Sequence, residues 1–306
     1  MSDKVRQMTN KVVLTGKLAE LTVLKGKTKD GVPYVSVKGA VQFGDNKAQT
    51  RRFEKFVQEY SINKETKTRG KDNAAYPTTL QWATNAKSMA SLKPGEVATE
   101  VSIQGSFATN DYVDKSEKLI ESLKIQAAFF NDVNGDYKAT ADLEGYISAI
   151  TPETKGEDSE ETGRLRVTVL TNDYYGNIIP VKNIIVPADL RDVFEDNYEV
   201  GQTATLYLDF ILHKGEEKPK KSGGIGVQRT TDGASYVEMI LTGADKALDE
   251  DNPNAYSKEA VKIGLSERKN MLDALKEKGY QGGSSSSNSP ANAKTVAPVA
   301  DEEIPF

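Results

Sequence analysis

The chain has 306 residues, no cysteine and a single histidine, and its formal net charge at pH 7 is −5. The lack of cysteine excludes a disulfide framework, a thiolate metal site and a thiol nucleophile, and it fits a reducing compartment. No apolar run reaches the length of a membrane span and the first residues lack the apolar core of a secretion signal, so we expect a cytoplasmic protein without a membrane partner.

The charge is unevenly distributed along the chain. Residues 1–135 carry 21 Lys and Arg against 15 Asp and Glu, whereas residues 136–245 carry 11 against 20. A basic first half followed by an acidic segment indicates a polarised molecule. One region suits a polyanionic ligand, and the other suits electrostatic steering or protein partners.

Period-2 alternation of apolar residues predicts five strands and one helix in the first half of the chain. The strands are expected at residues 11–24, 34–43, 49–62, 98–109 and 119–130. A helix is expected over residues 79–92, between the third and fourth strands, with Thr79 as its N-cap and Pro94-Gly95 as its stop.

The same order of elements is repeated further along the chain. Strands are expected at residues 139–150, 163–171, 177–186, 202–212 and 234–243, with a helix opened by Pro187 again between the third and fourth strands. The first strands of the two copies share a short motif of leucine or isoleucine around a glycine. Its members are Leu14, Gly16, Leu18 and Leu21 in one copy and Leu143, Gly145, Ile147 and Ile150 in the other.

Five strands with one helix after the third is the element order of the OB-fold, a small closed Greek-key barrel. Gly16 and Gly145 lie in the middle of long first strands, where a barrel strand must bend sharply. We therefore expect an all-β protein with minor α content, built from tandem five-stranded OB-fold barrels. A β-bulge would also place glycine there, so two β-sandwiches remain an alternative.

The remaining residues divide into three segments. Residues 246–281 read as a connector and a helix at about 257–278, with Val261, Leu265, Leu272 and Leu275 at helical spacing and Gly279 at its end. We expect this helix to pack on the second barrel. Residues 282–300 are rich in Gly, Ser, Asn and Pro and should form a disordered linker. The expected domains are thus 1–135, the main binding barrel; 136–245, the second barrel; 246–281; 282–300; and 301–306.

The final six residues combine acids with a compact apolar end: Asp301, Glu302, Glu303, Ile304, Pro305 and Phe306. The acids attract a basic rim, and the phenylalanine can fill a pocket on a partner. This ending, behind a Ser/Gly/Pro/Asn linker and an OB-like body, resembles the acidic tip of bacterial and phage single-stranded DNA-binding proteins. The resemblance implies recruitment of replication, recombination and repair proteins through the tip. A bacterial member usually has one OB domain per chain, so two barrels fit a phage-encoded relative in the host cytoplasm, and an oligomer is left open.

Binding a single strand without sequence readout needs cations for phosphates and aromatic faces for stacking. Strand alternation places Tyr34, Lys38, Arg52, Phe56 and Tyr60 outward, whereas Phe53 and Trp82 read as core residues. In the second copy Arg164 and Arg166 alternate with apolar residues, so both should lie on the outward face. The loop at residues 214–229 could form a basic finger. The full set of candidate DNA-binding residues is Lys25, Lys27, Lys29, Tyr34, Lys38, Arg51, Arg52, Phe56, Tyr60, Lys64, Arg69, Tyr112, Arg164, Arg166, Tyr174 and Tyr175.

No catalytic or metal-binding constellation is recognisable in the sequence. His213 is the only histidine and has no nucleophile motif near it, so we expect no enzymatic activity, no cofactor and no metal. The prediction is a protein that coats single-stranded DNA. A non-catalytic replication or recombination adaptor, whose barrels bind mainly protein, is the alternative, and a metal-dependent nuclease is a distant third.

Overall fold

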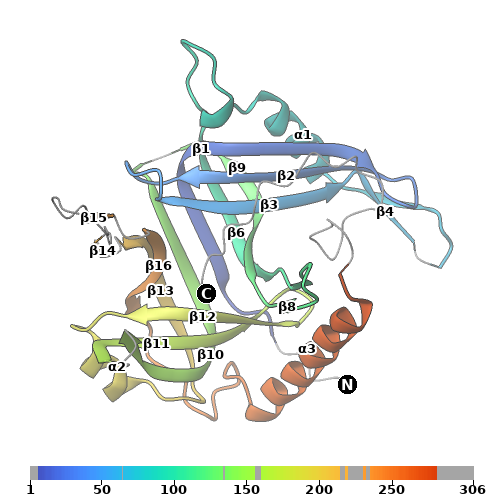
Figure 1. The fold of residues 1–306 in the computed structure, drawn as a ribbon. Helices are drawn as coiled ribbons and strands as arrows, with labels where there is room; N and C mark the ends of the chain where they lie inside the picture. The colour runs from blue at the N-terminus through green and yellow to red at the C-terminus, as the bar shows by residue number, and fades with distance from the viewer. Residues whose placement is uncertain are drawn as a thin grey trace.

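The computed structural model describes residues 6–63, 65–133, 135–155, 160–213, 218–219, 230–231 and 235–280. These residues form one ten-stranded sheet, short two-stranded hairpins and three α-helices (Figure 1). The strand pairings divide the large sheet into two closed circuits, which we name the first barrel and the second barrel.

The first barrel pairs its strands in the order β1–β2–β3–β9–β6 and closes from β6 back to β1. β3 and β9 run parallel, and the other pairs of this circuit are antiparallel. This is the OB-fold topology. The strands are β1 (Asn10–Lys27), β2 (Pro33–Gln42), β3 (Thr50–Gln58), β6 (Glu100–Thr109) and β9 (Leu123–Asn131).

The second barrel repeats that topology with the order β10–β11–β12–β16–β13 and closure from β13 to β10. β12 and β16 are its parallel pair. The predicted tandem OB-type barrels are therefore confirmed, and two open β-sandwiches are excluded because each circuit closes. The strands are β10 (Lys138–Lys155), β11 (Glu160–Asn172), β12 (Ile178–Val186), β13 (Thr203–His213) and β16 (Tyr236–Ala244), and helix α2 (Arg191–Asn197) lies between β12 and β13.

Helix α1 (Ala75–Asn85) lies between β3 and β6 as expected, but both of its ends differ from the prediction. Thr79 is a buried residue inside the helix and caps nothing. The Asn73 side chain instead accepts a hydrogen bond from the Ala75 backbone N–H at 3.0 Å. The helix ends early because the backbone of Lys87 hydrogen-bonds to Thr99, which closes the segment between them into a loop. Trp82 stacks on Phe130 with a centroid separation of 3.9 Å, as a core residue should.

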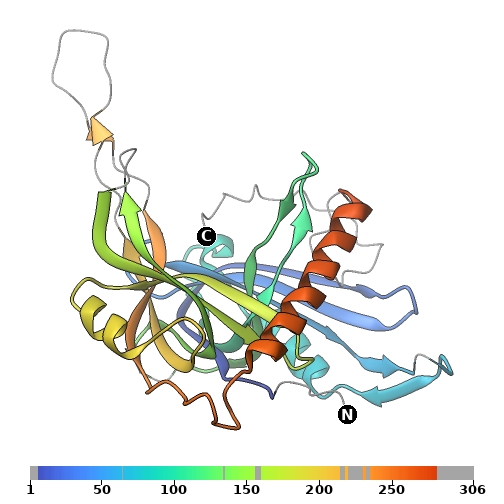
Figure 2. The same cartoon turned by 90° about the horizontal axis from the view of Figure 1, so that it is seen from below.

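Short elements extend from the barrels. A hairpin of β4 (Tyr60–Ile62) and β5 (Arg69–Asp72) precedes α1, the 3₁₀ helix η1 (Met89–Ser91) follows it, and a second hairpin joins β6 to β9 through β7 (Tyr112–Val113) and β8 (Leu119–Ile120). In the second barrel, β14 (Lys218–Pro219) pairs with β15 (Thr230–Thr231). Figure 2 shows the β1–β2 and β4–β5 hairpins, blue and cyan, projecting in the same direction.

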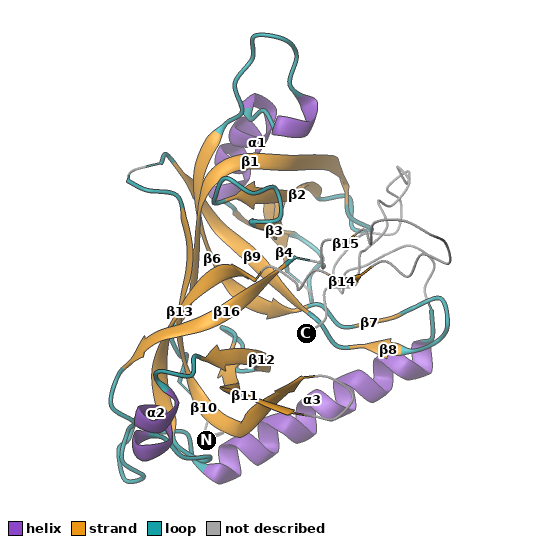
Figure 3. Cartoon of the chain, turned by 60° about the vertical axis from the view of Figure 1, so that its left-hand side comes forward, coloured by secondary structure: helices purple, strands orange, loops and turns teal. Residues whose placement is uncertain are grey.

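The two barrels are joined edge to edge through their first strands. β1 pairs antiparallel with β10, from Asn10 opposite Leu143 to Thr15 opposite Lys138. Ala139 and Ala141 on β10 are buried at this junction, and one continuous apolar core runs through both barrels. Figure 3 shows the uninterrupted sheet passing from one barrel to the other. Because the barrels share a sheet and a core, their relative orientation is built into the fold.

Both motif glycines lie where a first strand changes neighbours. β1 pairs with β10 as far as Thr15 and with β2 from Lys17 onward, so its backbone bends at Gly16. A Cβ at Gly16 would lie 2.0 Å from the backbone oxygen of a β2 residue. At Gly145 an added Cβ would lie 2.4 Å from a Val169 methyl group. The bend needs glycine at both positions because no side chain fits between the crossing strands.

Helix α3 (Lys258–Lys278) is capped at both ends. The hydroxyl of the N-cap residue Ser257 accepts a hydrogen bond from the Ala260 N–H at 3.1 Å, and the C-cap residue Gly279 has φ +63°. Val261 is buried against the second barrel, as predicted. Leu265, predicted on the packed face, is instead exposed because the packed face runs through Arg268. The helix therefore contacts both barrels, as Figure 1 shows.

Candidate nucleic-acid interface

The outer face of β2 and β3 brings four predicted residues together. Val35, Val37 and Phe53 fill the barrel interior, so the alternate residues of the two strands face away from it. The four residues on the outer face are Tyr34, Lys38, Arg52 and Phe56. We name this surface the β2–β3 face.

An aromatic pair forms one end of the β2–β3 face. The ring centroids of Tyr34 and Phe56 are 5.2 Å apart with an interplanar angle of 34°. Tyr34 is only 4% exposed, since its ring also covers Gly26 on β1, whereas Phe56 is half-buried. Tyr34 therefore supports Phe56 from beneath, and Phe56 is the ring that presents surface to solvent.

A carboxylate that the sequence prediction overlooked lies among the cations of this face. The Glu54 carboxylate forms ion pairs with the Lys38 ammonium at 2.8 Å and with the Lys124 ammonium of β9 at 3.2 Å. Burial alone would raise the pKa of Glu54, but the hydrogen bonds and charges of the two lysines outweigh it and hold that pKa below its ordinary value. Glu54 thus fixes both ammonium groups beside the aromatic pair and offsets one of their two charges. Lys124 could have been found from the alternation of β9.

The hairpins that flank the β2–β3 face carry further predicted residues. Lys25, Lys27 and Lys29 are exposed on the β1–β2 hairpin, and the Lys25 ammonium lies 3.4 Å from the Thr84 hydroxyl of α1. On the β4–β5 hairpin, the Arg69 guanidinium stacks 4.0 Å from the Tyr60 ring centroid and pairs with Asp72 at 2.8 Å. Arg52 is exposed, Tyr112 is half-buried on β7, and Lys64 lies outside the described residues.

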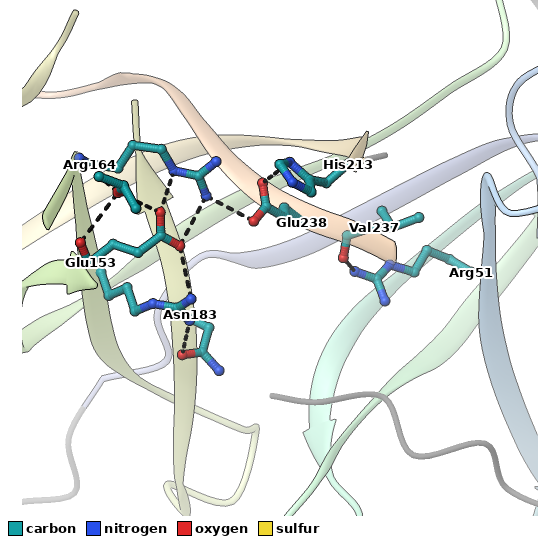
Figure 4. Close-up of polar contacts among 9 residues, drawn as sticks. Arg51, Glu153, Arg164, Asn183, His213, Val237 and Glu238 are labelled. Atoms are coloured by element: carbon teal, nitrogen blue, oxygen red, sulfur yellow. Dashed lines mark hydrogen bonds and ion pairs between the residues drawn. The ribbon is translucent and has the colours of Figure 1, made fainter. Parts of the chain in front are cut away.

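Arg51 does not share this surface. It has the same strand parity as Phe53, so its side chain points inward and reaches across to the second barrel (Figure 4). Its guanidinium donates to the Val237 carbonyl at 2.7 Å and lies 4.9 Å from the Phe210 ring centroid. Burial lowers the pKa of Arg51 to about 10. Arg51 is therefore a contact between the barrels, and its parity in the sequence already indicated an inward side chain.

The two predicted arginines of the second barrel, Arg164 and Arg166, belong to a partly buried ion-pair network, in which Figure 4 labels Arg164. Glu153, 3% exposed, pairs with Arg164 and with Arg166, each at 2.8 Å. Arg164 also pairs with Glu238 at 2.8 Å, and the His213 ring nitrogen lies 3.6 Å from the same carboxylate. Two carboxylates thus neutralise both guanidinium groups. Sequence alternation located the arginines correctly but could not show the acids that meet them.

Tyr174 and Tyr175 occupy the turn between β11 and β12 and are strongly exposed, at 79% and 77%. The predicted acidic tip, Asp301 to Phe306, lies outside the described residues, as do the linker before it and most of the predicted basic finger at residues 214–229. Within the described ranges, no helix is both long and apolar enough to cross a membrane. The same ranges contain no group of three or more His, Asp or Glu side chains arranged to hold a metal ion.

Similar solved structures include the wild-type single-stranded DNA-binding protein from Thermus aquaticus, with a TM-score of 0.45, 10% identity, and coverage of 80% of this chain and 95% of that chain. A deletion mutant from the same organism gives a TM-score of 0.45, 12% identity, and coverage of 80% and 97%. No curated protein matches this chain. A family model described as YorF matches residues 9–278, and the chain therefore belongs to the YorF family.

Proposed function

We propose that this chain binds single-stranded DNA without reading its sequence, chiefly through the β2–β3 face and the hairpins that flank it. The observation that carries the proposal is the Tyr34–Phe56 pair, placed beside Lys38, Lys124 and the exposed Arg52. Aromatic faces and cations along one groove are what a base and its phosphate require. Exposed lysines on the β1–β2 hairpin extend the positive surface.

In this proposal the residues take three roles. The Phe56 ring stacks on a base, and the Tyr34 ring holds the Phe56 ring in place. Arg52, Lys38 and the lysines of the β1–β2 hairpin contact phosphates, and Tyr60 with Arg69 forms a second stacking platform. Arg51, Arg164 and Arg166 are assigned to structure, because nearly buried carboxylates neutralise Arg164 and Arg166 and because Arg51 reaches across to the second barrel.

The proposal extends to the terminal residues of the sequence. Asp301 to Phe306 would recruit replication, recombination or repair proteins while the barrels stay on DNA, and this rests on the sequence pattern alone. The chain would then coat exposed single strands, exclude nucleases and deliver the coated strand to partners.

The test is fluorescence anisotropy of labelled oligo-dT titrated with the full chain across a salt series, against a duplex of equal length. We expect tight binding that favours the single strand and weakens as salt rises. Phe56→Leu keeps apolar volume but removes the ring, and should weaken binding about fivefold to a hundredfold. Arg52→Gln should weaken binding and make the log–log salt slope shallower by about 0.7.

Lys93→Gln is the charge-matched control, because Lys93 is exposed in the loop before β6, away from the β2–β3 face. It should leave the salt slope nearly unchanged. If the chain fails to bind at low salt, even after residues 301–306 are deleted to remove self-competition, the DNA proposal is refuted. The adaptor alternative then stands.

A further inference from the structure

The β11–β12 turn presents two adjacent aromatic side chains to water. The Tyr174 and Tyr175 ring centroids are 5.5 Å apart at an interplanar angle of 82°, and more than three quarters of each residue is exposed. Other tyrosines of this chain, such as Tyr198 and Tyr207, donate their hydroxyls to Asp245. Two neighbouring large rings that are this strongly exposed form an apolar patch, and such patches mark interaction sites.

The backbone of the turn that carries these rings is held by hydrogen bonds to one carboxylate. The Asp173 carboxylate accepts from the Tyr175 N–H at 2.8 Å and from the Asn177 N–H at 2.9 Å, and its other oxygen accepts from the Asn177 side-chain amide at 2.8 Å. Gly176 has φ +86°, a conformation that glycine adopts without strain. Because the turn is already ordered, a ligand that stacks on the rings loses little backbone entropy.

The turn lies beside the first barrel. Helix α3 packs on Ile178, the first residue of β12, and its Arg268 pairs with Asp111 at 2.9 Å and with Glu121 at 3.0 Å, at the two ends of the β7–β8 hairpin. Lys182 of β12 is also 4.0 Å from Glu121. In Figure 1 the start of β12 meets the β8 hairpin beside α3. A DNA strand that leaves the first barrel over the β7–β8 hairpin therefore reaches the β11–β12 turn next.

We propose that Tyr174 and Tyr175 stack on bases of a DNA strand that has already crossed the first barrel, so that one chain holds a single strand on both barrels. This inference rests on the proposed function of the first barrel. The same inference explains how an acidic second barrel contacts DNA. Arg164 and Arg166 of that barrel are neutralised by Glu153 and Glu238, so its contact with DNA is made by stacking and releases few counterions.

The experiment measures binding of oligo-dT of increasing length by anisotropy, with the full chain and the double variant Tyr174→Ala/Tyr175→Ala. Short oligonucleotides, which fill only the first barrel, should bind both proteins equally. Longer ones should bind the native chain about fivefold to a hundredfold more tightly than the double variant. The increment gained with length should vary little with salt, unlike the affinity for the short oligonucleotide. The matched control Tyr174→Phe/Tyr175→Phe keeps both rings and should bind like the native chain.

Three results would overturn the inference. The double alanine variant could bind long oligonucleotides as tightly as the native chain, or it could lose affinity for all lengths equally. It could also keep its DNA affinity and lose a protein partner, which would make the turn a protein-docking site. Failure of the native chain to bind short oligonucleotides refutes the proposed function itself and is seen in the same titration. Thermal unfolding of both variants should match the native chain, since the rings are exposed.

Discussion

Replacing Glu54 with Gln tests the electrostatics of the β2–β3 face directly. Glu54 holds Lys38 at 2.8 Å and Lys124 at 3.2 Å, and its lowered pKa means that the carboxylate is charged at neutral pH. A neutral amide keeps the shape and a hydrogen-bond acceptor but removes the negative charge that competes with phosphate. We therefore expect Glu54→Gln to bind single-stranded DNA more tightly than the native chain.

The size of the effect follows from counterion release. Glu54 offsets one of the two lysine charges, so its removal raises Z by about one and the log–log salt slope steepens by about 0.7 for a single strand. The advantage of the variant should then be about 2.6-fold greater at 50 mM than at 200 mM salt. The lost ion pairs are half-exposed, so the stability cost should stay within about 1 kcal/mol per pair.

The assay is the oligo-dT anisotropy titration at four or more salt concentrations. Glu267→Gln is the matched control, because Glu267 is an exposed carboxylate on α3, outside the β2–β3 face. It changes net charge equally and should alter the slope far less. Equal slopes for Glu54→Gln and Glu267→Gln would refute the view that Glu54 restrains two DNA-binding lysines.

Three predictions concern stability. The native chain should gain stability relative to Lys55→Met as pH rises toward 10.5. Burial lowers the pKa of the Lys55 amine, so the amine loses its proton at a lower pH in the folded state than in the unfolded state. Chemical denaturation at several pH values measures this difference. Arg268→Met should cost about 3–5 kcal/mol in urea unfolding, since it leaves the buried Asp111 carboxylate unpaired. Gly16→Ala should cost about 1–3 kcal/mol in the same assay, because its Cβ would collide with the backbone of β2.

Each of the three stability predictions has a control variant or a result that would contradict it. Stability curves of native and Lys55→Met that stay parallel with pH would show that the amine has the same pKa in both states. Arg191→Met breaks ion pairs with exposed Glu161 and Glu195, which solvent screens, and should leave the free energy of unfolding nearly unchanged. At Gly243 an added Cβ has its nearest neighbour at 3.7 Å, so Gly243→Ala should be nearly neutral. Equal costs at Gly16 and Gly243 would contradict the steric argument.

Local patterns in the sequence specified the elements and their order. Alternation in residues such as Val35, Val37 and Phe53 located the strands and the interior face, and all three are buried. Gly16 and Gly145 marked the bends of the two first strands. These predictions succeeded because strand periodicity and glycine geometry are properties of a few adjacent residues.

The candidate site was predictable only as a list of outward-facing residues. The same alternation that placed Arg164 outward could not supply Glu238, which is 74 residues further along the chain. Likewise Glu54 meets Lys124 across a separation of 70 residues. A phosphate-binding cation and a neutralised one have the same local pattern, so sequence periodicity does not distinguish them.

The sequence by itself determined the order of elements in two five-stranded repeats, the glycines of their first strands and the helix that follows them. Only the tertiary structure decided which charges remain available, because ion pairs form between strands that closure of a barrel brings together. It also decided that β1 joins β10 and that Arg51 spans the two barrels. Strand pairing between distant segments fixes both outcomes, since backbone hydrogen bonds set the register and the register sets which side chains meet.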